Sequence, residues 1–322
     1  MKYKLFGTQT GLPASEVILG AASLGQRRGY GAVAEDIPGI LGAYADAGGN
    51  FIDIADQYQF GEAEEIVGRF IESNRQDFII CTKYTLSSEK VAAQGNMGNH
   101  RKAMRQAVEG SLKRLKTDYI DLYMPHFDDG LTPIEEIARG LEDLTKSGKV
   151  LYTGLANFPA WKAAAVASGI RLNALQMEYN LVQRTADREL IGMANYFGLG
   201  KMFYSPLAGG LLTGKYRKGE AGRLTISTSG TYRENAVTST ILDELEAIAS
   251  EVEATPGQVA LAWILTKDAF AIIGARTLRH IQDGLRALEV KLDPDHVTRL
   301  DKVSSIDLGY PHDLLKTVQK SY

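Results

Sequence analysis

The residues best suited to chemistry in this sequence are an acid, a phenol, an amine and an imidazole: Asp53, Tyr58, Lys83 and His126. A phenol with a pKa near ~10 is a poor acid at neutral pH, but a nearby ammonium group favours the phenolate and lowers that pKa. A buried carboxylate keeps such a lysine charged, so Asp53, Lys83 and Tyr58 can form a proton-tuning chain. With His126 as a hydrogen-bond donor, the set predicts proton delivery to a carbonyl oxygen.

Other kinds of catalysis have less support in the sequence. No nucleophile is paired with a base, and the component that the set lacks is a hydride donor. The histidines are too widely separated to show metal-ligand spacing: His100, His126, His280, His296 and His312. We therefore predict no metal site.

The four residues lie at the ends of segments that have the pattern of buried strands. Residues 51–54 are an apolar run interrupted by Asp53, and Tyr58 follows in a polar segment that cannot belong to the same strand. A carboxylate in such a run costs several kcal/mol, in order of magnitude, unless it is paired. Lys83 ends the run 78–83, and His126 follows a third run. Neighbouring strand ends of a closed barrel lie ~5 Å apart, so these side chains can meet at one mouth.

Each member of the set has an ordinary structural explanation when taken alone. Asp53 could be the acid of a structural ion pair, Tyr58 a loop tyrosine, and Lys83 a solvated strand end. His126 lies in a turn-like loop after Pro125. Four complementary groups at successive strand ends are harder to explain by coincidence, so we favour a shared site.

Strand-like and helix-like segments alternate along the chain, which predicts parallel strands joined by helices. Residues 2–13 have the pattern of a hairpin, and 16–20 form the first buried strand. Seven further strands end near these residues: Ala55, Lys83, His126, Ala156, Tyr179, Ser205 and Gly274. The amphipathic helical stretches are 36–48, 61–74, 100–116, 133–147, 184–197, 256–267 and 278–288.

A closed barrel fits this pattern better than an open sheet does. The first strand leads into residues 20–25, Gly-Ala-Ala-Ser-Leu-Gly, which lack the Gly-x-Gly-x-x-Gly of a dinucleotide-binding open sheet. Eight strands is also the number that a (β/α)8 TIM barrel requires. We predict one barrel domain over residues 1–322, with an N-terminal β-hairpin and long loops at its C-terminal face.

Local signals mark two helix starts and two long loops. Residues 132–135 and 255–258 have the sequence of capping boxes, each with a proline in the first turn. The connections 84–99 and 207–238 are much longer than the others and leave the C-terminal ends of strands, where barrel active sites lie. Such loops are usually functional or disordered, and we favour coverage of a substrate or cofactor.

The composition limits the partners and the compartment. A formal net charge of -3 over 322 residues gives no electrostatic reason to expect nucleic acid or an anionic membrane as partner. No stretch approaches ~18 uninterrupted apolar residues, and the first residues lack the apolar run of a signal peptide. The single cysteine, Cys81, suits a reducing compartment. We expect a cytoplasmic protein that acts on small molecules.

Several separately spaced motifs resemble the signatures of the aldo-keto reductase superfamily, and the resemblance covers nearly the whole chain. The segments are 49–58 with 61–68 after it, then 121–126 and 148–158. The resemblance implies a (β/α)8 barrel that uses a nicotinamide cofactor, usually NADPH. It also implies that the four residues above are the catalytic tetrad, with Tyr58 as the acid.

The resemblance further implies a set of cofactor contacts. Asn157 and Gln176 would bind the nicotinamide carboxamide, and Tyr204 would stack on the nicotinamide ring. The residues expected near the pyrophosphate are Ser205, Leu207, Gly209 and Lys215. The adenosine end would lie along a segment that contains Gly274, Arg276 and His280. There the Arg276 guanidinium would bind the 2′-phosphate with paired hydrogen bonds.

Ordinary explanations for these residues stay open. Asn157 could cap a helix, Gln176 could be a satisfied buried amide, Tyr204 could fill the barrel, and Lys215 and Arg276 could be solvated charges. The sequence also departs from the family pattern at three positions: Ala156, where serine is frequent, Phe127, where arginine is common, and Gly284, where many relatives have an adenine-binding asparagine. These departures concern cofactor binding more than the tetrad.

Taken together, the sequence predicts reversible, NADPH-dependent reduction of an aldehyde or ketone, with NADH as the less favoured cofactor. One alternative is a cofactor-sensing regulatory subunit with little turnover, and a weaker one is a non-redox lyase or isomerase. Tyr30, Phe60 and Phe127 near the predicted mouth suggest an aryl or other flat apolar carbonyl, but surface packing explains single aromatic residues equally well, and sugar-type carbonyls stay open.

Overall fold

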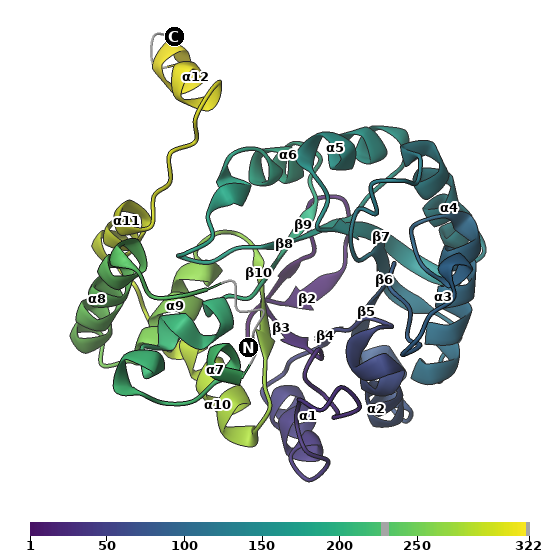
Figure 1. Ribbon diagram of the computed structural model, residues 1–322, viewed down its shortest axis with the longest axis horizontal. Helices are drawn as coiled ribbons and strands as arrows, with labels where there is room; N and C mark the ends of the chain where they lie inside the picture. The colour runs from purple at the N-terminus through teal and green to yellow at the C-terminus, as the bar shows by residue number, and fades with distance from the viewer. Residues whose placement is uncertain (227–231, 320–322) are drawn as a thin grey trace.

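The computed structural model describes residues 1–226 and 232–319, in which eight parallel strands close into a barrel. Figure 1 shows these strands at the centre of a ring of helices. The strands are β3 (Val17–Gly20), β4 (Phe51–Asp53), β5 (Ile79–Tyr84), β6 (Ile120–Pro125), β7 (Val150–Ala156), β8 (Ala174–Glu178), β9 (Gly200–Tyr204) and β10 (Phe270–Gly274). They pair in chain order, and β10 closes the barrel against β3. The predicted (β/α)8 TIM barrel is confirmed.

The outer layer consists of helices that pack on the barrel or on one another. Those that follow strands or long connections are α1 (Ile37–Asp46), α2 (Glu62–Ile71), α3 (Arg101–Leu115), α4 (Ile134–Lys146), α5 (Ala160–Gly169), α6 (Leu190–Tyr196), α7 (Arg223–Ile226), α8 (Ala236–Glu251), α9 (Pro256–Leu265) and α10 (Leu278–Arg286). Two more follow β10 and α10, namely α11 (Pro294–Val303) and α12 (His312–Gln319). No helix in the described ranges is long and apolar enough to cross a membrane.

Apolar residues fill the barrel because strands surrounded by helices must be buried on both faces. One cluster of buried side chains lies inside the barrel and includes Ile18, Phe51 and Phe270. A larger cluster includes inner-facing residues of the helices and packs them onto the strands.

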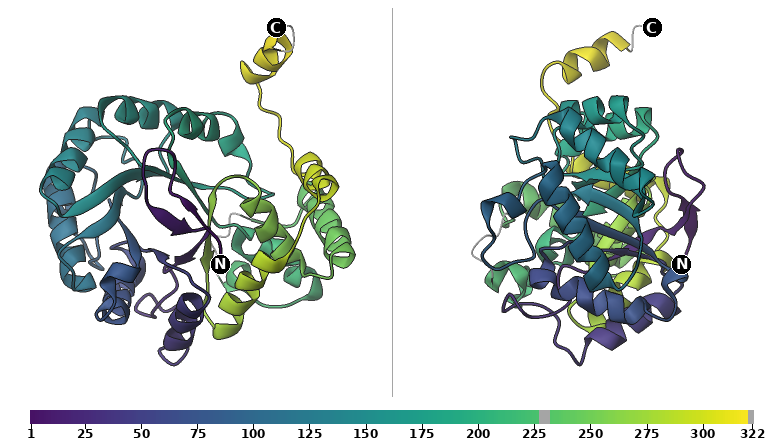
Figure 2. Two further views of the ribbon diagram at one scale, coloured as in Figure 1. Left: turned by 180° about the vertical axis from the view of Figure 1, so that it is seen from behind. Right: turned by 90° about the vertical axis from the view of Figure 1, so that its right-hand side faces the viewer.

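The N-terminal hairpin closes the bottom of the barrel. Its strands, β1 (Tyr3–Leu5) and β2 (Pro13–Ser15), pair antiparallel, which confirms the predicted hairpin. Phe6 between them is 1% exposed and packs with its ring centroid 5.5 Å from Phe51 and 5.1 Å from Phe270. Because both partners begin their strands, the hairpin covers the N-terminal ends and leaves the opposite end accessible. Figure 2 shows the hairpin at one end of the barrel.

One of the two predicted capping boxes is present. The Thr255 side chain accepts from the Gln258 backbone, and the Gln258 side chain accepts in return from the Thr255 N–H. The box predicted at Thr132 is wrong, since the helix there has Pro133 at its N-cap and no side-chain cap. The Thr132 hydroxyl instead donates to Asp129 Oδ2 at 2.6 Å, so a local carboxylate competes for it.

Among the residues that the structure describes, five helices were not anticipated from the sequence pattern: α5, α7, α8, α11 and α12, with α7 inside the connection 207–238. The helix α5 buries little more than Ala163 and Val166, so its amphipathic signal is weak. The helix α8 begins at Ala236, inside the connection 207–238 that was expected to be irregular, and Asn235 caps it. Residues 227–231 of that connection lie outside the described residues. The helices α11 and α12 come after the last strand, where the alternation of strands and helices gives no guide.

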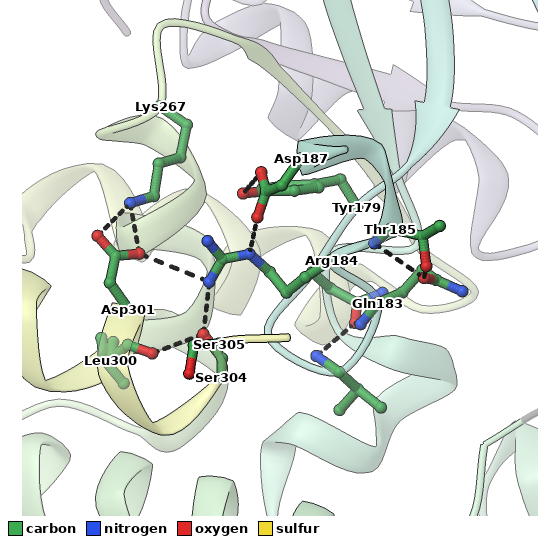
Figure 3. Close-up of polar contacts among 12 residues, drawn as sticks. Tyr179, Gln183, Arg184, Thr185, Asp187, Lys267, Leu300, Asp301, Ser304 and Ser305 are labelled. Carbon is green, nitrogen blue, oxygen red and sulfur yellow. Dashed lines mark hydrogen bonds and ion pairs between the residues drawn. The ribbon is translucent and has the colours of Figure 1, made fainter. Parts of the chain in front are cut away.

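A polar cluster ties α11 to the barrel (Figure 3). The Arg184 guanidinium lies 2.8 Å from Asp187 Oδ2 and donates to Ser304 Oγ at 2.6 Å. It also lies 3.6 Å from Asp301 Oδ1, which accepts from Lys267 Nζ at 2.6 Å. The last helix, α12, lies apart from this cluster at the end of an extended segment (Figure 1).

Candidate active site

The four residues of the predicted tetrad lie together at the C-terminal ends of β4, β5 and β6. Lys83 Nζ donates to Asp53 Oδ1 at 2.7 Å, and both side chains are almost completely buried. The same ammonium lies 5.2 Å from the centroid of the Tyr58 ring. The Tyr58 and His126 rings meet edge to face, with centroids 5.5 Å apart. The barrel therefore brings an ion pair, a phenol and an imidazole into contact.

The buried ion pair is electrostatically stable. Burial alone would lower the pKa of the Lys83 ammonium, but Asp53, Tyr58 and Cys81 together outweigh it, with Asp53 the largest of the three, and the pKa lies above its usual value. The lysine is therefore positively charged at any physiological pH, as the sequence suggested. The Lys83 ammonium also donates to the Ile54 carbonyl oxygen, so its hydrogen-bonding capacity is largely used within the protein.

The net pKa shift of the Tyr58 phenol is opposite to the expected one, although Lys83 acts in the expected direction. Burial raises the pKa of Tyr58 to about 12, and Lys83 opposes this shift only in part, by its charge and by a hydrogen bond. The sequence argument counted the ammonium and left out the loss of water around the phenol, which is the larger effect. Tyr58 consequently holds its proton firmly at neutral pH, which suits a group that must be protonated before it acts as an acid.

The His126 imidazole is neutral and is held by neighbours on several sides. Burial, with a contribution from the Lys83 charge, lowers the pKa of His126 to about 2. Phe127 stacks on the imidazole with centroids 4.4 Å apart and planes at 15°. Gln57 Nε2 lies 3.1 Å from His126 Nδ1. The sequence reasoning missed Gln57, although its position next to Tyr58 was a usable signal.

The backbone around His126 is fixed by a network of buried hydrogen bonds. The His126 N–H donates to the Tyr84 carbonyl at 2.7 Å, and the Thr85 hydroxyl oxygen lies 3.1 Å from the same nitrogen. Thr85 Oγ1 donates to Asn99 Oδ1 at 2.6 Å, and Asn99 Nδ2 donates to the Phe127 carbonyl at 2.8 Å. Asn99 ends the long connection 84–99, so this loop positions the histidine strand end as well as flanking the mouth.

Three residues expected to hold the nicotinamide lie against the tetrad. Gln176 Nε2 donates to Asp53 Oδ1 at 2.8 Å, and Asn157 Nδ2 donates to the His126 carbonyl at 2.9 Å. The Tyr204 hydroxyl donates to Asn157 Oδ1 at 2.7 Å. Asn157 does not cap α5, which has Pro159 at its N-cap and no side-chain cap. These contacts place two amides and a half-buried tyrosine ring around one side of the mouth.

The residues expected near a pyrophosphate lie in the loop after β9. Ser205 has φ +54°, and Gly209 has φ +66°, so the chain turns through left-handed conformations directly after the strand. A β-carbon at position 209 would lie 2.9 Å from a terminal methyl of the Leu224 side chain, which can move, so it is mainly the positive φ that favours glycine there. Leu207 and Gly209 are both partly exposed. A tightly turned loop of this kind presents backbone groups rather than side chains.

Beyond this loop, three titratable side chains lie close together: Lys215, Arg276 and His280. Burial and the Arg276 charge lower the pKa of Lys215, and burial, Arg276 and Lys215 lower the pKa of His280. The Arg276 N–H donates to His280 Nδ1 at 3.4 Å, while its guanidinium stacks over the Tyr30 ring at 4.7 Å. Gly274 is exposed at the adjoining strand end.

Lys215 and Arg276, with the neutral His280 imidazole beside them, fit a phosphate-bearing ligand. Among residues 1–226 and 232–319, neither Lys215 nor Arg276 has a carboxylate within 4.0 Å. Two like charges with no carboxylate in direct contact gain free energy from an anion, even with Glu220 close enough to act on Lys215 by its charge. The chemistry of this donor set therefore matches the phosphates of a dinucleotide, whereas the amide and tyrosine groups nearer the tetrad match its nicotinamide.

A second glutamine anchors the loop that follows β3. Gln59 has φ +52° and a buried side chain, and its Oε1 accepts from the Arg28 N–H at 2.9 Å. Its Nε2 donates to the Tyr30 carbonyl at 2.8 Å. Arg28 in turn lies over the Phe60 ring at 4.4 Å. The strained turn after Tyr58 thus fixes both Tyr30 and Phe60, two of the aromatic residues expected near the mouth.

Comparison with known proteins identifies the family of this chain. The model of the Aldo/keto reductase family matches residues 16–305. An aryl-alcohol dehydrogenase [NADP(+)] of Phanerodontia chrysosporium is 32% identical over 330 residues, covering 94% of this chain and 86% of the relative. Norsolorinic acid reductase B of Dothistroma septosporum is 32% identical over 336 residues, covering 98% and 84%. The aldo-keto reductase ausK of Aspergillus calidoustus is 30% identical over 338 residues, covering 98% and 85%.

The family match spans most of the chain and all eight barrel strands, and the relatives are similar along nearly their whole length. The buried ion pair, the phenol and the imidazole lie inside the matched residues, at the barrel end that the hairpin leaves accessible. This chain belongs to the aldo/keto reductase family and is an oxidoreductase.

Proposed function

We propose that this enzyme reduces an aromatic aldehyde or ketone to the alcohol with NADPH, reversibly, and that Tyr58 supplies the proton. The observation that carries the proposal is the buried Asp53–Lys83 pair beside a protonated phenol that also touches His126. This set can give a proton and a hydrogen bond to one carbonyl oxygen. Family membership supports carbonyl reduction as the reaction.

The residues that would hold the cofactor form two groups. Asn157, Gln176 and Tyr204 would surround the nicotinamide, which supplies a hydride to the carbonyl carbon when it is bound. The Lys215 and Arg276 charges would bind the phosphates, with Arg276 on the 2′-phosphate. Support for NADPH comes from this unpaired arginine and from the name of the Phanerodontia relative.

The protein groups act on the carbonyl oxygen. As negative charge develops there, Tyr58 transfers its phenolic proton to the oxygen, and the Lys83 ammonium stabilises the phenolate that remains. Asp53 keeps the lysine charged and in place throughout. The neutral His126 donates a second hydrogen bond that fixes the orientation of the carbonyl. In the oxidative direction the same phenolate accepts the proton of the alcohol.

An aromatic substrate is supported by the groups at the mouth. Phe127 stacks on His126, and Phe60 lies in the turn that follows Tyr58. Flat apolar side chains next to the reacting groups favour a flat apolar substrate, because stacking adds about 0.5–1.5 kcal/mol to area burial. The name of one relative, an aryl-alcohol dehydrogenase, points in the same direction.

The proposal is tested with Tyr58→Phe, assayed with an aromatic aldehyde and NADPH. We expect kcat/KM to fall by about 10²–10⁴-fold, the usual contribution of a general acid, while NADPH still binds. Tyr196→Phe is the matched control because Tyr196 is 85% exposed on α6. Turnover near that of the wild type in a folded Tyr58→Phe variant would overturn the mechanism. The cofactor-sensing alternative predicts binding without sustained turnover, so the wild-type assay separates the two.

The NADPH preference is tested with Arg276→Ala. We expect the ratio of NADPH to NADH affinities to fall by about tenfold or more, because an arginine–phosphate pair is a charge-assisted contact worth roughly 1.5–3 kcal/mol. Fluorescence titration with each cofactor measures the ratio. Arg286→Ala, at the far end of α10, is the control. An unchanged ratio in Arg276→Ala shows that another residue binds the 2′-phosphate.

A further inference from the structure

Gln57 makes a contact that decides which His126 nitrogen carries the proton. Its side-chain nitrogen Nε2 lies 3.1 Å from His126 Nδ1. An amide nitrogen donates hydrogen bonds and cannot accept them, so in this orientation of the amide Nδ1 is the acceptor, whereas a flipped amide would place Oε1 there and require the proton on Nδ1. With the amide oriented as in the structure, the single proton of a neutral imidazole lies on Nε2, which makes Nε2–H the donor of the ring.

The other contacts of the imidazole do not distinguish its two nitrogens. Phe127 stacks at 4.4 Å and Tyr58 packs edge to face at 5.5 Å, which holds the plane of the ring. Neither contact opposes a 180° flip or a change of tautomer. Among the residues that the structure describes, Gln57 has the one side chain that hydrogen-bonds a His126 ring nitrogen.

Gln57 is itself well placed for this role. Its carbonyl oxygen accepts from Arg28 Nη2 at 2.9 Å, which ties its backbone to the loop after β3. Tyr58, the next residue, donates its N–H to the Ala55 carbonyl at 3.0 Å. A single turn after β4 therefore carries the phenol and the amide, so the proton donor and the group that orients the imidazole are fixed by the same backbone.

We propose that Gln57 is a positioning residue that keeps the His126 proton on Nε2, so that Nε2–H donates to the substrate carbonyl. The carbonyl part rests on the proposed function, whereas the tautomer is a property of the protein alone. A hydrogen bond to a carbonyl oxygen strengthens as negative charge develops. Loss of the Gln57 contact is therefore expected to lower kcat more than it raises KM.

The tautomer is measured by ¹⁵N NMR of histidine-labelled protein without substrate. We expect His126 in the wild type to be protonated at Nε2, with Nδ1 accepting a hydrogen bond. Gln57→Glu offers Nδ1 a carboxylate, which can only accept, so the proton should move to Nδ1. Gln57→Met removes the contact with little change in volume. Gln76→Glu, an exposed position before β5, is the control and should leave the His126 signals unchanged.

The same variants are assayed with an aromatic aldehyde and NADPH. We expect kcat to fall about two- to tenfold in Gln57→Met, the worth of one hydrogen bond, and about tenfold or more in Gln57→Glu. The KM for aldehyde and the Kd for NADPH should change by less than about threefold, since a hydrogen bond gained mainly in the transition state does not affect them.

Two results would overturn the positioning role: a wild-type His126 protonated at Nδ1, or a Gln57→Glu variant with wild-type tautomer and kcat. If neither variant folds, the wild-type tautomer still decides the matter. A wild type with Nε2–H but no turnover would refute the proposed function and leave the tautomer assignment standing. The two proposals can thus fail separately.

Discussion

At the scale of single residues, the candidate site contains an acid that its chemistry does not use. Asp56 is 3% exposed, and its Oδ1 has no hydrogen-bond partner within the described part of the chain. Burial and the Glu64 carboxylate raise its pKa well above the usual value, against the opposing charges of Arg114 and Lys83. Asp56 therefore tends to hold a proton in the folded protein that it releases in the unfolded chain.

This difference makes stability depend on pH. A folded-state pKa above the unfolded value contributes stability that is fully present below the unfolded pKa, near ~3.9, and is lost as pH rises through the folded pKa. We expect Asp56→Asn to remove this loss of stability with rising pH. Relative to wild type, the variant should gain up to about 1.4 kcal/mol per pH unit across this window. Urea unfolding between pH 4 and pH 8 measures the difference.

Tyr123→Phe provides the control for the Asp56 prediction. The Tyr123 hydroxyl is the other completely buried oxygen near Asp56 that lacks a partner, and the two groups interact electrostatically. Its removal deletes a polar atom without deleting a group that titrates between pH 4 and pH 8. We expect a pH-independent change in stability from it. A pH-independent difference in Asp56→Asn as well would show that the acid is paired in solution.

Residue identities at the site were more predictable than residue properties. The strand ends carrying Asp53, Lys83 and His126 were visible in the sequence because buried apolar runs precede them. The pKa of Tyr58 was predicted in the wrong direction because a sequence shows which charges are near but not how much water is lost. Gln57 was missed because an amide has no fixed role until its partner is known.

At the scale of elements, the turn after Tyr58 is held in a costly conformation by side-chain contacts. Gln59 and Phe60 have φ of +52° and +54°, a region that costs L-residues about 1–2 kcal/mol each. The buried Gln59 amide bonds the Arg28 N–H and the Tyr30 carbonyl, which fixes the loop after β3. These hydrogen bonds offset the backbone strain and couple two loops at the mouth.

Two variants of Gln59 separate the energetic cost of its positive φ from the contribution of its side-chain hydrogen bonds. Gln59→Ala should lower the free energy of unfolding by about 1–3 kcal/mol, because it leaves the Arg28 and Tyr30 backbone groups unpaired and keeps the strained φ. Gln59→Gly loses the same hydrogen bonds but relieves the strain, so it should be about 1 kcal/mol more stable than Gln59→Ala. Urea denaturation of both variants measures this. Equal stability of the two would show that the positive φ carries no cost.

Elements were predictable where the pattern was strong and local. The Thr255 capping box was found because its two hydrogen bonds lie within four residues of chain. The Thr132 box failed because Asp129, three residues earlier, takes the hydroxyl. Helix α5 was missed because its alanines form a helix without a distinct apolar face. Local sequence signals therefore identify an element well only while no tertiary partner competes.

At the scale of the whole molecule, the closed barrel was predictable from the sequence, whereas the polar contacts that hold the outer helices were not. Eight apolar runs imply the closed sheet, and their order along the chain gives the order of the strands. By contrast, Arg184 bonds Ser304 across 120 positions of sequence, and nothing near either residue suggests the contact. Such polar contacts depend on the finished fold, so they can be read only from the structure.

The Arg184 cluster is expected to hold α11 against the barrel (Figure 3). The Arg184 side chain is 11% exposed and contacts Asp187, Ser304 and Asp301. Its guanidinium also lies 5.0 Å from the Trp263 ring. Arg184→Leu removes all of these contacts, while Asp301 keeps its bond from Lys267. Because Asp301 stays paired, only part of the hydrogen bonding in the cluster is lost. We expect the free energy of unfolding to fall by about 2–3 kcal/mol.

The loss should be local as well as global, because α11 makes its main contacts with α8 and this cluster. In Arg184→Leu, amide hydrogen exchange of residues 294–303 should accelerate before that of the barrel strands. Arg188→Leu is the matched control, since Arg188 is exposed in the same loop and, within the described residues, its side chain donates one hydrogen bond, to the Asp307 carbonyl at 3.1 Å. It should change stability by less than about 0.5 kcal/mol. If amide hydrogen exchange in Arg184→Leu accelerates equally in α11 and in the barrel strands, α11 unfolds together with the barrel, and the cluster does not stabilise α11 separately.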